Sequence, residues 1–324
     1  MAKTIKTAVT EKLGIEYPII QGCMQWIARA PLVAAVSEAG GLGIISSSTF
    51  RDKEALREEI RAVKAMTSKP FAVNLTLMPS LVVPDYMGYI QVCAEEGVRI
   101  IETAGRPPKD DMVAAIKGAG ITLIHKCTTV KHALKAQSIG ADMVVADGCE
   151  CAGHPGENDI TTMVLTPACV AALDIPVIAA GGIADGRQLA AALALGACGV
   201  QVGTCLLVSE ECPIHENYKA ALLNAKDSDT IVTGRIGGSP VRVLKNRMSR
   251  EYVRQEKAGA DKMELEKYTL GSLRRAVFEG DTSTGSLMAG QVAGMLHEVR
   301  PVADILNDLW NGGRQRIHAL SEEC

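Results

Sequence analysis

Residues 177–183 read VIAAGGI and residues 199–204 read GVQVGT, so two short apolar runs each end in glycine. Runs that are apolar on both faces and are followed by a helical pattern are typical of a parallel sheet covered by helices. Similar runs precede them at regular spacing, which gives eight predicted strands: Tyr17–Gln21, Gly43–Ser46, Phe71–Thr76, Val98–Thr103, Thr122–His125, Met143–Ala146, Val177–Ala180 and Gly199–Val202. Eight strand–helix units predict an α/β protein with a closed (β/α)8 TIM barrel.

Amphipathic segments separate the predicted strands, and their apolar residues recur at helical spacing. The clearest are Pro31–Ala39, Lys53–Met66, Lys109–Gly118, Lys131–Ile139 and Gly186–Leu195. After the eighth strand the chain becomes more charged and is interrupted by GGSP at 237–240. We therefore expect three parts: a barrel over residues 1–205, a smaller, mainly helical region over 206–300 that packs over the barrel mouth, and a closing helix at Val302–Leu320 within 301–324.

The composition restricts the class of protein. The 324 residues carry a net charge of −3 and are 3% aromatic, which argues against a nucleic-acid partner and an anionic lipid surface. The ten cysteines form no disulfide framework and no CxxC pair, and no signal peptide is visible at the start. No apolar stretch of about 18 residues or more is present, so no membrane segment is predicted. We expect a cytoplasmic protein with reduced thiols.

The working residues of such a barrel lie at the carboxyl ends of its strands. The seventh and eighth strands end in Gly181-Gly182 and Gly203-Thr204. Glycines leave backbone N–H groups open to a phosphate, and a helix N-terminus behind them favours negative charge. A phosphate site is predicted here, and a pair of tight turns without a ligand is the alternative.

Three further strand ends carry side chains suited to a flat, redox-active ring. Gly22, Cys23 and Met24 follow the first strand, where backbone can approach an isoalloxazine and Met24 can pack against its edge, although Met24 can also belong to the core. Asn74 offers a donor and an acceptor to the pyrimidine edge of a flavin, or caps a turn. Lys126 would be costly in a barrel mouth without a partner, and a flavin that gains negative charge on reduction is one.

The stretch DGCECAGHPG at 147–156 follows the sixth strand and holds the densest group of functional residue types. Ala152 and Gly153 let the chain pass close to a ring, and His154 then lies where a substrate would bind. Because an imidazole titrates near neutrality, His154 can give or take a proton there. Asp147 and Glu150 either orient loops or bond a flavin hydroxyl.

Other chemistry at this loop is disfavoured. A zinc site of His154 with Cys149, Cys151 and Glu157 matches no standard ligand spacing, so no metal is predicted. Cys149 as a nucleophile would need a partner base, for which only His154 is near in sequence. His125, beside Lys126, is expected to point into the barrel wall.

Several of these stretches resemble the nitronate monooxygenase family, formerly called 2-nitropropane dioxygenases. They are QGCMQW (21–26), EAGGLGII (38–45), FAVNLTLMP (71–79), ETAG (102–105), CAGHPGEND (151–159) and PVIAAGGIADGR (176–187). HKCT (125–128) and HALKA (132–136) look most like the branch that contains bacterial NADH:quinone reductases. The later stretches TGR (233–235), PVRVLKN (240–246) and GSLMAGQ (285–291) look instead like the FMN-dependent enoyl-acyl-carrier-protein reductase II.

The resemblance implies an FMN-binding barrel with His154 as its active-site histidine. It also implies a substrate side that includes Gln25, and a gate over the nicotinamide site that includes Pro79. Cys23 stands where relatives commonly have a second glycine, and Cys205 where many have arginine. Together, the residues and the resemblance predict these FMN contacts: Gly22, Cys23, Met24, Asn74, Lys126, Asp147, Ala152, Gly153, Gly181, Gly182, Gln201, Gly203, Thr204, Met288 and Gly290.

We therefore expect a homodimeric, FMN-dependent oxidoreductase with NADH or NADPH as co-substrate. Three small-molecule acceptors remain open. A nitronate with oxygen needs no nicotinamide, a quinone makes the protein a two-electron reductase, and an enoyl thioester makes it a fatty-acid enzyme. A phosphate-binding barrel without redox activity is the alternative from another class.

Overall fold

The computed structural model describes residues 6–78 and 83–323. Its centre is a barrel of eight parallel strands in the hydrogen-bonded order β1-β8-β7-β6-β5-β4-β3-β2. A parallel bridge between Ile20 and Leu42 connects β1 to the residue before β2. The strands are β1 (Ile19–Gln21), β2 (Gly43–Ser46), β3 (Phe71–Leu77), β4 (Ile100–Gly105), β5 (Thr122–Cys127), β6 (Met143–Asp147), β7 (Val177–Ala180) and β8 (Gly199–Val202). The predicted TIM barrel is confirmed.

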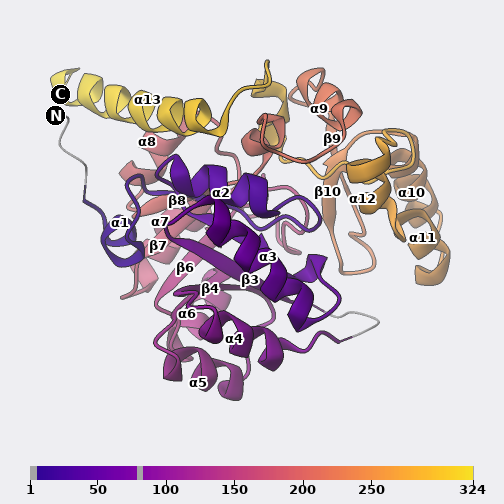
Figure 1. The fold of residues 1–324 in the computed structure, drawn as a ribbon. Coiled ribbons are helices and arrows are strands. Elements are labelled where there is room, and N and C mark those ends of the chain that lie inside the picture. Colours follow the sequence, from indigo (N-terminus) through magenta and orange to yellow (C-terminus); the bar gives the residue numbers. More distant parts are fainter. Residues whose placement is uncertain (1–5, 79–82, 324) are drawn as a thin grey trace.

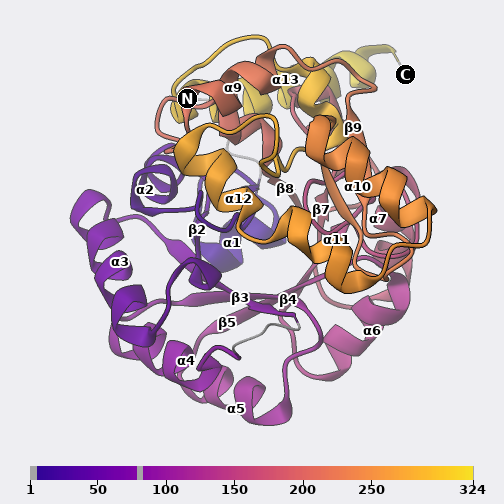
Figure 2. The ribbon, with the colours of Figure 1, turned by 90° about the vertical axis from the view of Figure 1, so that its right-hand side faces the viewer.

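Helices surround the barrel, as the view along it in Figure 2 shows. They are α2 (Ala30–Glu38), α3 (Lys53–Met66), α4 (Tyr86–Glu95), α5 (Asp110–Gly118), α6 (Val130–Ser138), α7 (Thr162–Ala172) and α8 (Gly186–Ala194). Helix α1 (Ala8–Leu13) instead lies behind the centre of the barrel in this view, and its Val9 and Leu13 pack with the residues of the barrel interior. Helix α3 shows why these segments form helices that pack on the barrel. Asp52 caps its first turn by accepting from the Ala55 amide at 2.9 Å, and Leu56, Ile60 and Val63 form one buried stripe at helical spacing.

Branched side chains fill the barrel interior. Ile20, Ile44, Ile124 and Ile178, from four different strands, belong to one buried cluster. Fully burying an isoleucine side chain stabilises a fold by about 1.5–3 kcal/mol, so this cluster holds the barrel closed. The polar residues discussed below lie at the carboxyl ends of the same strands, where the apolar packing stops.

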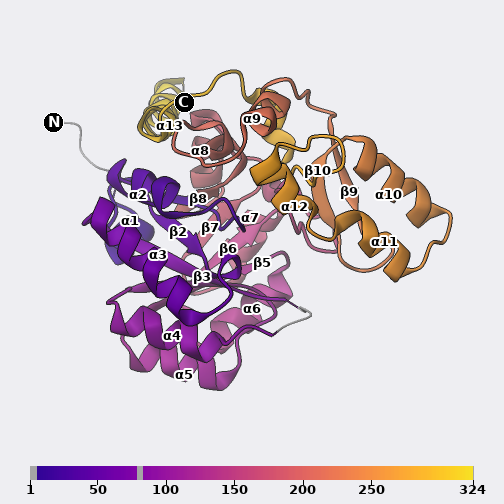
Figure 3. The same cartoon turned by 45° about the vertical axis from the view of Figure 1, so that its right-hand side comes forward.

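Residues 206–300, here called the lid region, lie over one side of the barrel mouth (Figures 2 and 3). They form α9 (Glu216–Leu223), β9 (Thr230–Thr233), β10 (Val241–Leu244), α10 (Arg247–Lys257), α11 (Lys262–Thr269) and α12 (Ser272–Arg274). The region is mainly helical, as predicted. The antiparallel pair β9–β10 was not predicted, and the GGSP interruption at 237–240 proves to lie in its connection.

Helix α13 (Val302–Glu323) includes the predicted closing helix and runs across the barrel beside α8 (Figure 1). The two helices cross where Gly312 and Gly313 meet Gly186. A Cβ on Gly186 would come within 2.3 Å of the Gly313 amide nitrogen, so only glycine permits this approach. None of the helices in residues 6–78 and 83–323 has the length and apolarity needed to cross a bilayer.

Candidate functional site

A cavity of about 640 Å³ lies at the carboxyl ends of the strands and reaches the lid region. Its volume is within the range of roughly 300–1,000 Å³ that is typical of cofactor and small-molecule sites. Every predicted site residue that the structure describes lines this cavity, from Gly22, directly after β1, to Gly290 in the lid region. Pro79 lies outside the described residues.

The tips of β7 and β8 offer free backbone donors. Gly181 and Gly182 have φ values of +87° and +72°, which favour glycine. Among the hydrogen bonds of the described residues, the amides of Gly181, Gly182 and Gly203 have no acceptor. Three such N–H groups at adjacent strand ends fit an oxyanion such as a phosphate.

Helix α8 itself contributes less to this anion site than the sequence predicted. Asp185 caps its N-terminus by accepting from the amides of Arg187 at 2.8 Å and Gln188 at 3.3 Å. A carboxylate therefore already occupies the first turn of α8. The open donors are those of the glycine tips, and Thr204 is engaged as well, because its hydroxyl oxygen accepts from the Gly290 amide at 2.9 Å.

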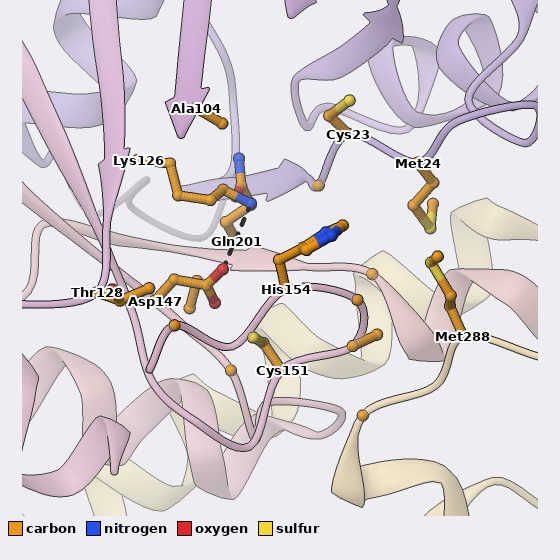
Figure 4. A pocket seen from close by; sticks show the side chains of 18 of the residues that line it. Cys23, Met24, Ala104, Lys126, Thr128, Asp147, Cys151, His154, Gln201 and Met288 are labelled. Atoms are coloured by element: carbon orange, nitrogen blue, oxygen red, sulfur yellow. Dashed lines mark ion pairs between the residues drawn. The ribbon is translucent and has the colours of Figure 1, made fainter. Parts of the chain in front are cut away.

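Lys126, at the end of β5, has a partner within the protein. Its Nζ lies 3.8 Å from Oδ2 of Asp147 on β6 (Figure 4). Burial acts to lower the pKa of Lys126, but the carboxylates of Asp147 and Glu102 outweigh it and the pKa is raised, so the ammonium is charged at neutral pH. The negative partner that this lysine needs is therefore provided by the protein itself, through Asp147, and does not require a ligand.

A buried carboxylate, Glu102 on β4, was missed by the sequence reasoning. It is fully buried and accepts from Nδ2 of Asn74 at 2.7 Å and from Nε2 of Gln201 at 2.5 Å. Asn74 lies within β3 and does not cap a turn; its Oδ1 accepts from the hydroxyl of Thr76 at 2.8 Å. A signal for Glu102 was available, since an acidic residue inside an otherwise apolar strand needs polar partners.

The loop after β6 presents His154 to the cavity. In Figure 4 the imidazole points into the open space, with Lys126 and Asp147 on one side and Met24 and Met288 on the other. The ring is accessible through the cavity yet surrounded by protein, and this desolvation lowers its pKa, so His154 is neutral at pH 7. A neutral imidazole has one donor and one acceptor nitrogen and can therefore give or accept a hydrogen bond.

The lid region holds this loop in place. The amide of Arg242 on β10 donates to the Gly153 carbonyl at 2.7 Å, and the Gly153 amide donates back to the Arg242 carbonyl at 3.2 Å. The Arg242 guanidinium donates to the carbonyl of Cys149 at 2.9 Å. From the barrel side, Glu150 accepts from the Thr162 amide at 3.0 Å, a contact that ties the loop to the start of α7.

The second histidine of interest, His125, is buried in the barrel wall as expected. Its Nδ1 lies 2.8 Å from the Thr103 hydroxyl, and burial lowers its pKa to about 4. It does not line the cavity.

The thiols near the cavity are protonated. Burial raises the pKa of Cys23 to about 12 and also raises the pKa of Cys149, so neither provides a thiolate at neutral pH. This disfavours the nucleophile alternative for Cys149.

Trp26 packs against the lid region, edge to face with Phe278 at a centroid distance of 6.1 Å.

Comparisons with known proteins agree with this geometry. The nitronate monooxygenase family model matches residues 6–312. The 5-hydroxy-7a-methyl-1-oxo-octahydro-1H-indene-4-carboxyl-CoA dehydrogenase of Rhodococcus jostii (strain RHA1) is 34% identical over 98% of this chain and 98% of its own. A probable nitronate monooxygenase of Staphylococcus saprophyticus is 36% identical over 75% of this chain and 79% of its own. The solved structure of FabK from Thermotoga maritima superposes with a TM-score of 0.92 at 39% identity, over 99% of this chain and 100% of that one.

The family match spans both the barrel and the lid region, and the two curated relatives are named as a dehydrogenase and a probable nitronate monooxygenase. We conclude that this chain belongs to the nitronate monooxygenase family and is a flavin-dependent oxidoreductase.

Proposed function

We propose that this protein is an FMN-dependent reductase that takes electrons from NADH or NADPH and delivers them to an enoyl thioester. The choice of an enoyl thioester as the acceptor is supported by one observation: the lid region contributes part of the cavity wall. Gly238, Ser239, Pro240 and Leu273 of the lid region line the cavity together with the strand tips. The likeness to FabK extends over 99% of the chain, so it includes this wall as well as the barrel. The name of the Rhodococcus jostii relative also includes a CoA thioester.

The cavity wall divides into parts that suit the parts of FMN. We assign the phosphate to the free amides of Gly181, Gly182 and Gly203. We assign the polar edge of the ring to Asn74, Gln201 and Lys126, which the structure groups around Glu102. The sulfur atoms of Met24 and Met288 and the backbone of Ala152 and Gly153 then provide the apolar contacts. When bound, FMN supplies the two-electron transfer that no side chain can perform.

His154 is the group we assign to the proton. Reduction of a carbon–carbon double bond adds a hydride equivalent to one carbon and a proton to the other. The neutral imidazole can donate its N–H to the thioester side of the acceptor and assist proton delivery from solvent through the open cavity. Lys126 and Asp147 remain paired at the opposite wall and supply fixed charge.

The test is a pair of half-reactions under anaerobic conditions. Purified holoenzyme is mixed with NADH or with NADPH, and bleaching of the flavin absorbance is followed by stopped flow. The reduced enzyme is then mixed with crotonyl-CoA, with a quinone or with propyl nitronate. We expect fast reoxidation by crotonyl-CoA. Reoxidation by the quinone alone would assign a quinone reductase instead, and a protein that neither contains nor takes up FMN would remove the reductase proposal.

A second candidate is nitronate oxidation with oxygen, because the family model and the Staphylococcus saprophyticus relative carry that name. A neutral His154 also suits it, since its free ring nitrogen can accept a proton. Oxygen consumption with propyl nitronate in the absence of nicotinamide would favour this candidate. We also propose a homodimer, which light scattering of the holoenzyme tests.

A further inference from the structure

Glu102 has no part in the chemistry proposed above, yet it occupies the centre of the polar cluster. Its two carboxylate oxygens are used separately: Oε1 accepts from Asn74 on the adjacent strand β3, and Oε2 accepts from Gln201 on β8. Strands β5, β6 and β7 stand between β4 and β8 in the sheet order. Glu102 therefore links opposite sides of the barrel through one side chain.

The carboxylate determines which way both amides face. A carboxylate only accepts hydrogen bonds, whereas a glutamine or asparagine amide donates at nitrogen and accepts at oxygen. Both NH2 groups must therefore face Glu102, and both amide oxygens are turned elsewhere. Oδ1 of Asn74 is satisfied by the hydroxyl of Thr76 at 2.8 Å.

The amide oxygen of Gln201 is left without a donor. Gln201 is 3% exposed and lines the cavity, and within the part of the chain that the structure describes its Oε1 has no hydrogen-bond partner. Buried acceptors without a donor are rare and unfavourable in folded proteins. An unpaired acceptor in a cavity wall indicates a ligand that brings an N–H group.

We propose that Glu102 is a positioning residue, which holds the Gln201 amide in the one orientation that offers Oε1 to the N3–H group of the flavin pyrimidine ring. The match is one of chemistry, because N3–H is the N–H donor of the oxidised flavin ring and Oε1 of Gln201 is the buried acceptor without a partner. The inference depends on flavin binding alone. It stands or falls independently of the donor and acceptor proposed above.

The experiment compares FMN with 3-methyl-FMN, which lacks the N3–H group. Apoprotein is titrated with each flavin, and dissociation constants are read from quenching of flavin fluorescence. Wild-type protein is expected to bind FMN at least about tenfold more tightly than 3-methyl-FMN, because methylation leaves the buried acceptor unpaired.

The test variant is Glu102→Gln, which keeps the shape of the side chain. The amide that it introduces accepts at one end and donates at the other, so Asn74 and Gln201 cannot both keep their present orientation. We expect FMN affinity to fall about tenfold and the preference for FMN over the methylated flavin to shrink to within about threefold. Gln201→Met, which removes the acceptor and leaves the carboxylate, should lose the same preference and serves if Glu102→Gln does not fold.

The matched control is Glu59→Gln. Glu59 is also a buried carboxylate, but it lies on α3, accepts from Arg29 and from the Ala30 amide, and does not line the cavity. This control should lower thermal stability and keep the wild-type ratio of the two dissociation constants. A wild-type ratio in Glu102→Gln or in Gln201→Met would overturn the proposal, as would a wild-type protein that does not distinguish the two flavins.

Discussion

Replacing Gly181 by alanine should damage both the fold and flavin binding, and the structure sets the size of each effect. At φ +87° a residue with a Cβ costs about 1–2 kcal/mol in backbone strain. The added Cβ would also lie 2.7 Å from the Gly148 carbonyl oxygen, a backbone atom that cannot rotate away. We expect a loss of roughly 2–4 kcal/mol in the free energy of unfolding.

The same change should weaken FMN binding. Relief of the clash moves the Gly181 amide, and losing one hydrogen bond to a charged phosphate corresponds to roughly a tenfold to hundredfold weaker affinity. The assays are chemical denaturation of the apoprotein and fluorescence titration with FMN and with riboflavin, which lacks the phosphate. Riboflavin affinity should change much less than FMN affinity.

Gly118→Ala is the matched control, because a Cβ on Gly118 at the end of α5 meets nothing within 4 Å. It should raise stability slightly, by about 0.5–1 kcal/mol, and leave both flavins unaffected. If Gly181→Ala retains wild-type FMN affinity, the tip of β7 does not hold the phosphate and the proposed placement of the cofactor fails.

Three further changes test the remaining parts of the site. His154→Ala should slow the oxidative half-reaction roughly 10²–10⁴-fold while flavin stays bound, as stopped flow would show; unchanged turnover with every acceptor would limit His154 to packing. Lys126→Met should lower the two-electron potential of bound FMN by roughly 30–60 mV in a dye-coupled redox titration, because the charge that opposes Asp147 and Glu102 is gone; an unchanged potential would place the ring elsewhere. Burial lowers the pKa of His125 to about 4, whereas its pKa in the unfolded chain is about 6.5. Between these two pH values only the unfolded state gains the proton, so the free energy of unfolding should fall by about 3 kcal/mol as the pH drops from about 6.5 to about 4. His125→Asn should remove this share of the pH dependence in denaturation series between pH 7 and 4, and equal slopes for the two proteins would contradict the assignment.

The barrel could be predicted because its strands are buried on both faces and are bounded by glycine. β2, β7 and β8 have their predicted limits, whereas β4 begins and ends two residues later than predicted, since Ala104 and Gly105 at its end have the composition of a turn. The strands β9 and β10 do not differ in this way from the chain around them. They are four residues each, flanked by charged and glycine-rich chain, so neither differs by composition from the helices and turns around it.

The candidate site divides in the same way. Residues at strand tips were predictable because the carboxyl ends of all barrel strands meet at one face, so a position along the chain is also a position in space. For Glu102 the sequence could indicate only that it needs polar partners; which residues these are could not be predicted, because they lie 28 and 99 residues away in sequence. The partner of Lys126 was expected to be the ligand, yet Asp147 lies close enough to fill that role.

The two-way hydrogen bonding between β10 and Gly153 has a consequence for protein engineering. Gly238, Ser239 and Pro240, which come just before β10, line the cavity, and β10 itself fixes the backbone beside His154. Transplanting residues 206–300 from a relative to alter substrate choice would therefore also shift the imidazole. Such a chimera would change substrate choice and the position of His154 together. To change substrate choice alone, the design should retain Arg242 and its contacts to Gly153 and Cys149 from this chain.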